Sequence, residues 1–187
     1  MLNYNSVIKN EINQENVSVK EISPVIKINL RGKKREFLTN VGKNLNMILP
    51  TEANTSTTSD KLTAIWLSPD EWMIISNELA SKDTNKSDLY EMLFNSISKT
   101  NLGAVIDVTD QFVQLELKGE NVYEIFSAGS PFNFNEFKEK KGSTTQTILN
   151  HVDVILHHKD ENVVNLLVRR SFAEHLCSWI EDCCSRI

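Results

Sequence analysis

The chain has 187 residues, an apolar fraction of 40%, a charged fraction of 24% and a net charge of −5. A globular chain of this length buries enough apolar surface to fold without disulfides or metals. The negative charge argues against nucleic acid as a partner, and no apolar run approaches the roughly 20 residues of a membrane span. The N-terminus lacks the basic and apolar segments of a secretory signal, so we expect a cytoplasmic protein.

The cysteines agree with a reducing compartment. Cys177 and Cys184 lie about two helical turns apart, which is too far for a disulfide within one helix. Cys183 is adjacent to Cys184, and no Cys-x-x-Cys pair occurs. We therefore expect free thiols.

Residues 1–24 are rich in Asn, Glu, Ser and Lys, with isolated aliphatic residues and no sustained period. This pattern predicts an extended N-terminal arm, which either orders on a partner or stays frayed. Residues 25–187 are predicted to form a single α+β domain made of two half-units, about 25–108 and 111–187.

The first half-unit begins with a strand, because Val25 to Leu30 alternates apolar and polar residues. We expect it to continue with a helix, two strands joined by a Pro-Asp turn, a second helix and a further strand. These elements are assigned in that order to Lys33–Asn46, Leu62–Leu67, Trp72–Ser76, Ser87–Ser98 and Leu102–Val108.

The second half-unit repeats this order of elements. A strand and a short helix are followed by three β-rich runs and a terminal helix. The order strand–helix–strand–strand–helix therefore occurs twice, and it predicts two split βαβ, ferredoxin-like halves with mixed or antiparallel sheets. The segments before the terminal helix are Phe112–Leu117, Glu120–Ser127, Thr144–Leu149, Val152–His157 and Val163–Val168.

The terminal helix carries a capping-box spacing at Ser171 and Glu174. Arg169 and Arg170 precede it, next to the helix end that already bears partial positive charge. Either they contact a partner subunit or an anion, or they are exposed or paired within the chain. The apolar face predicted for this helix consists of Phe172, Leu176, Trp179, Ile180 and Cys183.

Two further pairs of residues have alternative interpretations. Asp107 and Asp110 are either a general acid and base at a strand end or groups that bond the backbone where the chain turns. Trp66 and Trp72 either stack on a flat ring such as a pterin or pack across strands into the core.

Other motifs of chemistry are missing from the sequence. The four histidines do not form a cluster with metal-ligand spacing, and neither a dinucleotide-binding nor a phosphate-binding glycine motif occurs. We assign no catalytic, cofactor-binding or metal-binding residue, and we retain Arg169 and Arg170 as candidates for a partner interface.

Five short segments occur in a fixed order along the chain: Trp66–Trp72, Val105–Asp110, Gly129–Pro131, Thr145–Thr147 and Val168–Ala173. The most specific are the Trp-Leu-Ser-Pro-Asp-Glu-Trp turn and the Val-Arg-Arg-Ser-Phe-Ala sequence near the C-terminus. Together the segments resemble the γ subunit of heterotetrameric sarcosine oxidase. Ser130 departs from the family pattern, because a cysteine is usual before the proline.

This resemblance implies a subunit without an active site that packs on the large α subunit, with β and δ subunits in the same complex. The complex demethylates sarcosine to glycine, passes the one-carbon unit to tetrahydrofolate and reduces oxygen to hydrogen peroxide. FAD, FMN, NAD, zinc and tetrahydrofolate are implied for the partner subunits, and none for this chain. The implied fold is that of the folate-binding aminomethyltransferase domain.

Two other functions remain open at the level of sequence. The chain is either a stand-alone folate-binding domain of the aminomethyltransferase type, or a scaffold subunit of a related complex that oxidises dimethylglycine or another methylamine. The first would need a pocket with a desolvated acid, for which Asp107 and Asp110 are the candidates.

Overall fold

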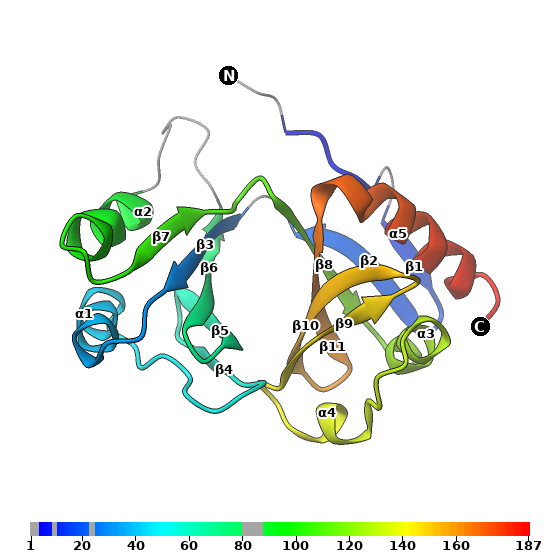
Figure 1. Cartoon of the computed structure of the whole chain (residues 1–187). Coiled ribbons are helices and arrows are strands. Elements are labelled where there is room, and N and C mark those ends of the chain that lie inside the picture. Colours follow the sequence, from blue (N-terminus) through cyan, green and yellow to red (C-terminus); the bar gives the residue numbers. More distant parts are fainter. Residues whose placement is uncertain (1–3, 9–10, 23–24, 80–87) are drawn as a thin grey trace. The chain divides into compact units, whose positions relative to one another are not determined.

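The computed structural model describes residues 4–8, 11–22, 25–79 and 88–187. The chain divides into two compact units. One unit consists of residues 25–109, and the other combines residues 110–187 with the first 24 residues. Each unit consists of one antiparallel sheet with its own helices (Figure 1). Among the described residues, no helix is both long and apolar enough to cross a membrane.

The unit formed by residues 25–109 contains a five-stranded sheet in the order β4-β5-β6-β3-β7. After β3 the chain forms α1 and later returns to the sheet as β5, which is parallel to β3. The next strand, β6, lies between them and is antiparallel to both. The split βαβ arrangement predicted for this half is therefore confirmed. Its elements are β3 (Val25–Arg31), α1 (Arg35–Leu45), β4 (Ser56–Thr58), β5 (Leu62–Ser68), β6 (Glu71–Leu79), α2 (Asp88–Leu93), the π-helical turn η1 (Phe94–Ser98) and β7 (Ala104–Asp107).

The predicted hairpin at Pro69 and Asp70 joins β5 to β6 and places Trp66 directly opposite Trp72. The Trp72 side chain is buried, and its ring centroid lies 5.9 Å from that of Phe37 on α1. Its indole N–H donates to the carbonyl of Pro50 over 2.8 Å. A buried indole needs such a partner, so Trp72 is a core residue that ties the hairpin to α1.

The other unit contains a six-stranded sheet in the order β1-β2-β8-β11-β10-β9, and every neighbouring pair is antiparallel. One face carries the core, because alternate residues such as Val113, Leu115 and Leu117 of β8 are buried there against the helices. The elements are β1 (Ile12–Gln14), β2 (Val17–Ile22), β8 (Phe112–Lys118), α3 (Val122–Gly129), α4 (Asn135–Glu139), β9 (Thr144–Leu149), β10 (Val152–Asp160), β11 (Val163–Arg169) and α5 (Arg170–Cys184).

The N-terminal segment differs from the predicted arm, because it supplies β1 and β2 to this sheet. Val17 and Val19 point to the core face and are almost completely buried, and Val19 lies opposite Leu117 of β8. Backbone pairing with β8 and the burial of these two side chains stabilise the strand. The polar composition of the segment conceals this short alternation.

The second half-unit has the predicted split βαβ arrangement as well. The chain leaves β8, forms α3 and α4, and β11 is inserted between β8 and β10, which are parallel to each other. The strand on the other side of β8 is β2 from the N-terminal segment, and not a strand that follows the second helix as in the first half-unit. Asn150 and His151, between β9 and β10, both have positive φ, as a two-residue type I′ turn requires. Such a short connection joins antiparallel neighbours, as β9 and β10 are. All strand pairs in both sheets are antiparallel, so the mixed sheet that we had considered is wrong for both halves.

The predicted capping box of the terminal helix is also wrong. The α5 helix begins at Arg170, so Ser171 lies inside its first turn, and no side chain among the residues that the structure describes caps the helix. The start is fixed by the strand, because the Arg170 N–H still bonds the Gln111 carbonyl beside β8. Phe172 is 50% exposed, since the buried face is displaced from the predicted one. That face consists of Ala173, Leu176, Cys177, Ile180 and Cys184.

We predict that Gly129→Ala destabilises the protein by about 1–3 kcal/mol, because overpacking forces displaced side chains. A Cβ at Gly129 would lie 2.5 Å from the Trp179 ring on α5 and 3.1 Å from the Asn150 nitrogen. Gly42→Ala is the matched control. A Cβ at this position contacts only the Met47 carbonyl, at 3.4 Å, and replacing a glycine inside α1 by alanine favours the helix. Urea unfolding of both variants tests this, and equal stabilities would contradict it.

Candidate functional site

The two arginines retained from the sequence lie in different environments at the start of α5. Arg170 is half-buried, and its guanidinium donates to the carbonyls of Asp110 and Asn5 over 3.3 and 3.4 Å. Its central carbon also lies 4.5 Å from the centre of the Tyr4 ring, which is a cation–π contact. Arg170 is therefore paired within its own unit.

Glu21, on β2, completes the attachment of the N-terminal residues. Its carboxylate accepts hydrogen bonds from the hydroxyls of Tyr4 and Ser6 and, over 2.8 Å, from the N–H of Val7. Partial burial, together with the hydrogen bond to this carboxylate, raises the pKa of Tyr4 to about 12. The phenol consequently remains a donor at neutral pH, and residues 4–7 are joined to both β2 and the start of α5.

Arg169 is exposed, and among the described residues its guanidinium has no hydrogen-bond or ion-pair partner. It occupies the N-cap position, where a positive charge opposes the helix dipole. Exposed Phe172 follows one turn later. Of the two candidates, Arg169 is the one whose charge is available to a second molecule.

Arg170→Ala is expected to loosen residues 4–8 from the sheet, because it removes a cation–π contact and two hydrogen bonds. At a partly exposed site these contacts are worth about 1 kcal/mol. Amide hydrogen exchange should accelerate about fivefold at Val7 and Ile8. Arg169→Ala is the control and should leave exchange unchanged; the same acceleration in both variants would show that helix electrostatics, not these contacts, hold the segment.

The alternatives posed for the acidic pair are resolved at Asp107. Its carboxylate accepts the Thr109 N–H over 2.9 Å, and the Thr109 hydroxyl accepts the Lys27 N–H over 3.0 Å. Both side chains thus bond the backbone where β7 ends, and Asp107 and Asp110 are exposed. The arrangement corresponds to the turn interpretation, and it does not place a desolvated carboxylate at this position.

Sequence reasoning missed a polar row on the sheet face opposite the core. Five residues on five strands lie directly opposite one another in the pairing register, and all except Lys20 are buried. The available signal was the alternation along β8, where Gln114, Glu116 and Lys118 occupy every second position. In strand order from β2 to β9 the row is Lys20, Glu116, Asn165, His157 and Thr144.

The charged end of this polar row is a three-residue cluster. The Glu116 carboxylate forms ion pairs with the ammonium groups of Lys20, at 2.9 Å, and Lys159, at 2.7 Å. Burial alone would raise the pKa of Glu116, but the two ammonium groups outweigh it and hold that pKa below its ordinary value. Asn165, the next residue in the row, has a buried side-chain oxygen that has no hydrogen-bond partner within the described part of the chain.

His157 in the same row makes stability depend on pH. Burial, reinforced by the charges of His158 and Lys159, lowers the pKa of His157 to about 4. Its pKa in the unfolded chain is about 6.5, so between pH 6.5 and 4 the unfolded state binds more protons than the folded one. The contribution of neutral His157 is complete above pH 6.5 and decreases as the pH falls to 4.

We predict that the free energy of unfolding falls by about 3 kcal/mol over this range through His157. His157→Gln should flatten the pH dependence between 6.5 and 4, which urea unfolding at several pH values measures. The matched control is His151→Gln, because His151 is exposed. An unchanged slope in His157→Gln would contradict the assignment.

The three cysteines are free thiols, as predicted. Burial raises the pKa of Cys177 to about 12 and that of Cys184 to about 11, and it also raises the pKa of Cys183. Because the thiolate is the reactive form, these thiols are poor nucleophiles at neutral pH. Within the described part of the chain, no group of three His, Cys, Asp or Glu residues is arranged to hold a metal ion.

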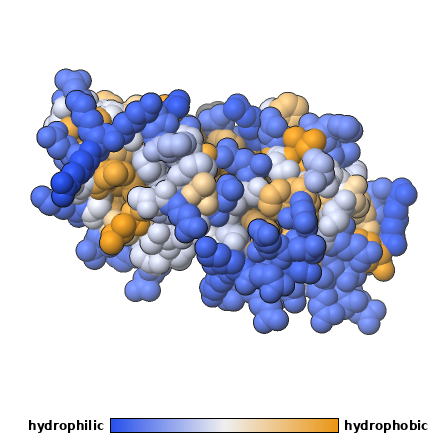
Figure 2. All heavy atoms as spheres, turned by 60° about the horizontal axis from the view of Figure 1, so that its bottom comes forward, coloured by the Kyte–Doolittle hydropathy of each residue, from blue (hydrophilic) through white to orange (hydrophobic). Residues whose placement is uncertain are grey.

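The described surface has a few large exposed apolar side chains. On the face shown in Figure 2, apolar residues form small patches separated by hydrophilic ones. Isolated apolar residues of this kind are ordinary on a protein surface. The exposed ones include Ile48, Ile106, Ile148, Phe172 and Ile187.

Residues 32–186 match the model of the "Sarcosine oxidase, gamma subunit family". The chain belongs to this family. No protein with a curated description matches it. The resemblance carried by the Trp66–Trp72 turn and the Val168–Ala173 segment is thereby confirmed.

Solved structures define the fold of this family member. A chain of the heterotetrameric sarcosine oxidase from Corynebacterium sp. U-96, in complex with pyrrole 2-carboxylate, aligns with a TM-score of 0.82 and 21% identity, covering 94% of this chain and 88% of that one. The glycine cleavage system aminomethyltransferase T from Bartonella henselae aligns with a TM-score of 0.62 and 17% identity, covering 88% of this chain and 45% of that one. The fold similarity to the aminomethyltransferase is thus confirmed.

Proposed function

We propose that this chain is the γ subunit of a heterotetrameric sarcosine oxidase, that it packs on the large α subunit and that it carries no active site of its own. The observation that supports this most strongly is the family match over residues 32–186. The fold agreement with a chain of a heterotetrameric sarcosine oxidase, over most of both chains, adds to it.

In this proposal the other subunits of a cytoplasmic complex catalyse the reaction. The complex converts sarcosine, tetrahydrofolate and oxygen into glycine, 5,10-methylenetetrahydrofolate and hydrogen peroxide. FAD, FMN, NAD, zinc and tetrahydrofolate are bound by the other subunits. The exposed carboxylates of Asp107 and Asp110, with Asp107 occupied by a backbone bond, support a role for this chain outside catalysis.

Turnover measurements test the absence of an active site. The isolated chain, given sarcosine, tetrahydrofolate, FAD, FMN and NAD, should form no hydrogen peroxide, whereas the complex co-expressed with its α, β and δ subunits should form it. Peroxide production by the isolated chain would contradict the proposal. Titrating tetrahydrofolate into the isolated chain tests the alternative of a folate-binding domain, which predicts heat of binding.

Arg169 is the side chain that we assign to the contact with the α subunit. Burying an arginine beside a partner carboxylate commonly contributes more than a tenfold factor in affinity. We predict that Arg169→Ala weakens assembly about tenfold and does not lower the urea midpoint of the isolated chain, because the lost charge opposes the helix dipole. Arg186→Ala is the control, because Arg186 is already paired with Asp182 at 2.8 Å. If Arg169→Ala and Arg186→Ala bind the α subunit with equal affinity, Arg169 does not contribute to the interface.

A further inference from the structure

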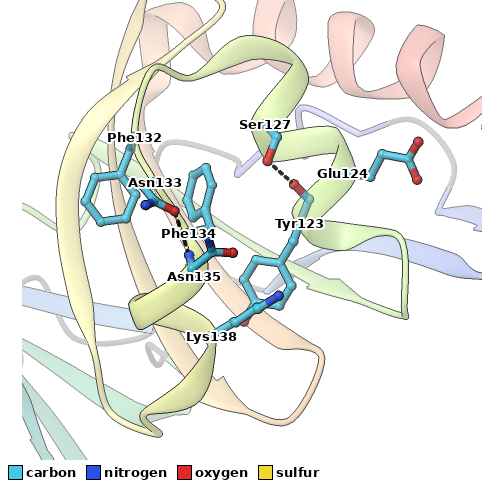
Figure 3. Close-up of a pocket in the computed structure, with 8 residues that line it drawn as sticks. All are labelled: Tyr123, Glu124, Ser127, Phe132, Asn133, Phe134, Asn135 and Lys138. Atoms are coloured by element: carbon cyan, nitrogen blue, oxygen red, sulfur yellow. Dashed lines mark hydrogen bonds between the residues drawn. The ribbon is translucent and has the colours of Figure 1, made fainter.

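A hollow of about 500 Å³ lies beside α3 and α4, and Figure 3 shows the side chains that line it. Part of its lining is polar and exposed, namely Asn133, Asn135 and Lys138. Of the rings that line it, Phe134 is buried, and so is the hydroxyl of Tyr123. The accessible lining therefore does not favour one kind of ligand, whereas the N-terminal residues show a more specific arrangement.

Residues 4–8, which we call the strap, lie beside the start of α5 without forming a strand (Figure 1). Glu21 of β2 accepts three hydrogen bonds from the strap, and Arg170 of α5 contacts the Tyr4 ring and the Asn5 carbonyl. The first three residues of the strap are exposed, and the last two are half-buried. A segment with so few buried contacts and two anchoring side chains opens at a lower cost in free energy than the sheet beside it.

The strap covers the margin of the core between β2 and α5. Val7 and Ile8 pack against the core cluster that includes Cys177 of α5. Glu21 lies on the core side of the sheet, because its partner in the register with β8 has its side chain in the core. Cys177 follows Arg170 by two helical turns, so both lie on the same face of α5. The strap and its two anchors are therefore on the side of α5 that carries the Cys177 thiol.

The Cys177 thiol is unreactive while the strap is closed. The residue is 8% exposed, and burial, together with the charge of Glu21, raises its pKa to about 12. The influence of Glu21 agrees with the arrangement above, in which the carboxylate that holds the strap lies near the thiol. Because the thiolate is the reactive form, both the burial and the carboxylate protect this cysteine.

We propose that the strap is a lid that keeps hydrogen peroxide from the Cys177 thiol, which reacts only when the strap opens. In the open state the sulfur attacks one peroxide oxygen. The S–O bond forms, the O–O bond breaks and the thiol proton joins the departing hydroxide as water, so that the cysteine is oxidised to a sulfenic acid. The peroxide is the product of the oxidase reaction proposed above, so the protective purpose rests on that proposal, whereas the opening of the strap does not.

Thiol labelling of the full chain tests the opening with added reagents, independently of turnover by any complex. Cys183→Ser removes the partly exposed thiol, and N-ethylmaleimide then reacts with Cys177 and Cys184, which fragment-ion mass spectrometry distinguishes. Arg170→Ala should accelerate labelling of Cys177 about fivefold, the factor expected for amide exchange in the strap. Cys184 is the internal control and should not change, because it is 2% exposed and lies two turns further along α5.

Tyr4→Ala is a second opening variant, because Tyr4 is exposed and contacts both anchors of the strap. It should also accelerate labelling of Cys177, whereas Arg169→Ala, the control, should change neither thiol. With added hydrogen peroxide and dimedone, which traps sulfenic acids, Arg170→Ala and Tyr4→Ala should increase trapping at Cys177 by a similar factor.

Three results would overturn the proposal. Equal acceleration at Cys177 and Cys184 would indicate that the whole unit opens. Unchanged labelling of Cys177 in both Arg170→Ala and Tyr4→Ala would show that the strap does not cover the thiol. Faster labelling without more trapping of sulfenic acid would show that the strap does not protect Cys177 from peroxide.

Discussion

The pairing of β8 with β2 on one side and β11 on the other is the constraint on which the larger unit depends. It buries alternate residues of β8 in the core, beside the valines that β2 contributes. The same register places Glu116 on the opposite face, opposite Lys20 and Asn165. Because side chains alternate along a strand, a slip of one residue would place the charged residues in the apolar core and the leucines among the polar residues of the opposite face.

This constraint also explains the position of Arg170. The β11 strand pairs with β8 up to Arg169 and Phe112, and α5 begins at the next residue. Arg170 is thereby placed next to the Asp110 carbonyl and the N-terminal residues, while Arg169 remains on the surface. Two adjacent arginines thus acquire different roles: Arg170 stabilises the fold, and Arg169 is available for the assembly that we propose.

The sequence predicted the elements whose formation depends on residues that are close together in the chain. The alternation of Val25–Arg31, the Pro69-Asp70 turn and the apolar spacing of Phe37, Val41 and Leu45 in α1 correspond to a strand, a hairpin and a helix in the structure. The free cysteines were also predicted, and the backbone bond of Asp107 is one of the two interpretations that the sequence left open. What the sequence could not predict is long-range. The pairing of β2 with β8 joins residues about 100 positions apart, and the polar row from Lys20 to Thr144 exists only after folding.

Native mass spectrometry of the complex, purified through a tag on this chain from the cell that produces it, shows whether the chain is a subunit of a larger oxidase. We expect one copy of this chain together with three different subunits, at least one of which binds flavin. Detection of the chain only as a monomer of 21.3 kDa, or with partner chains that lack flavin, would show that it is not such a subunit.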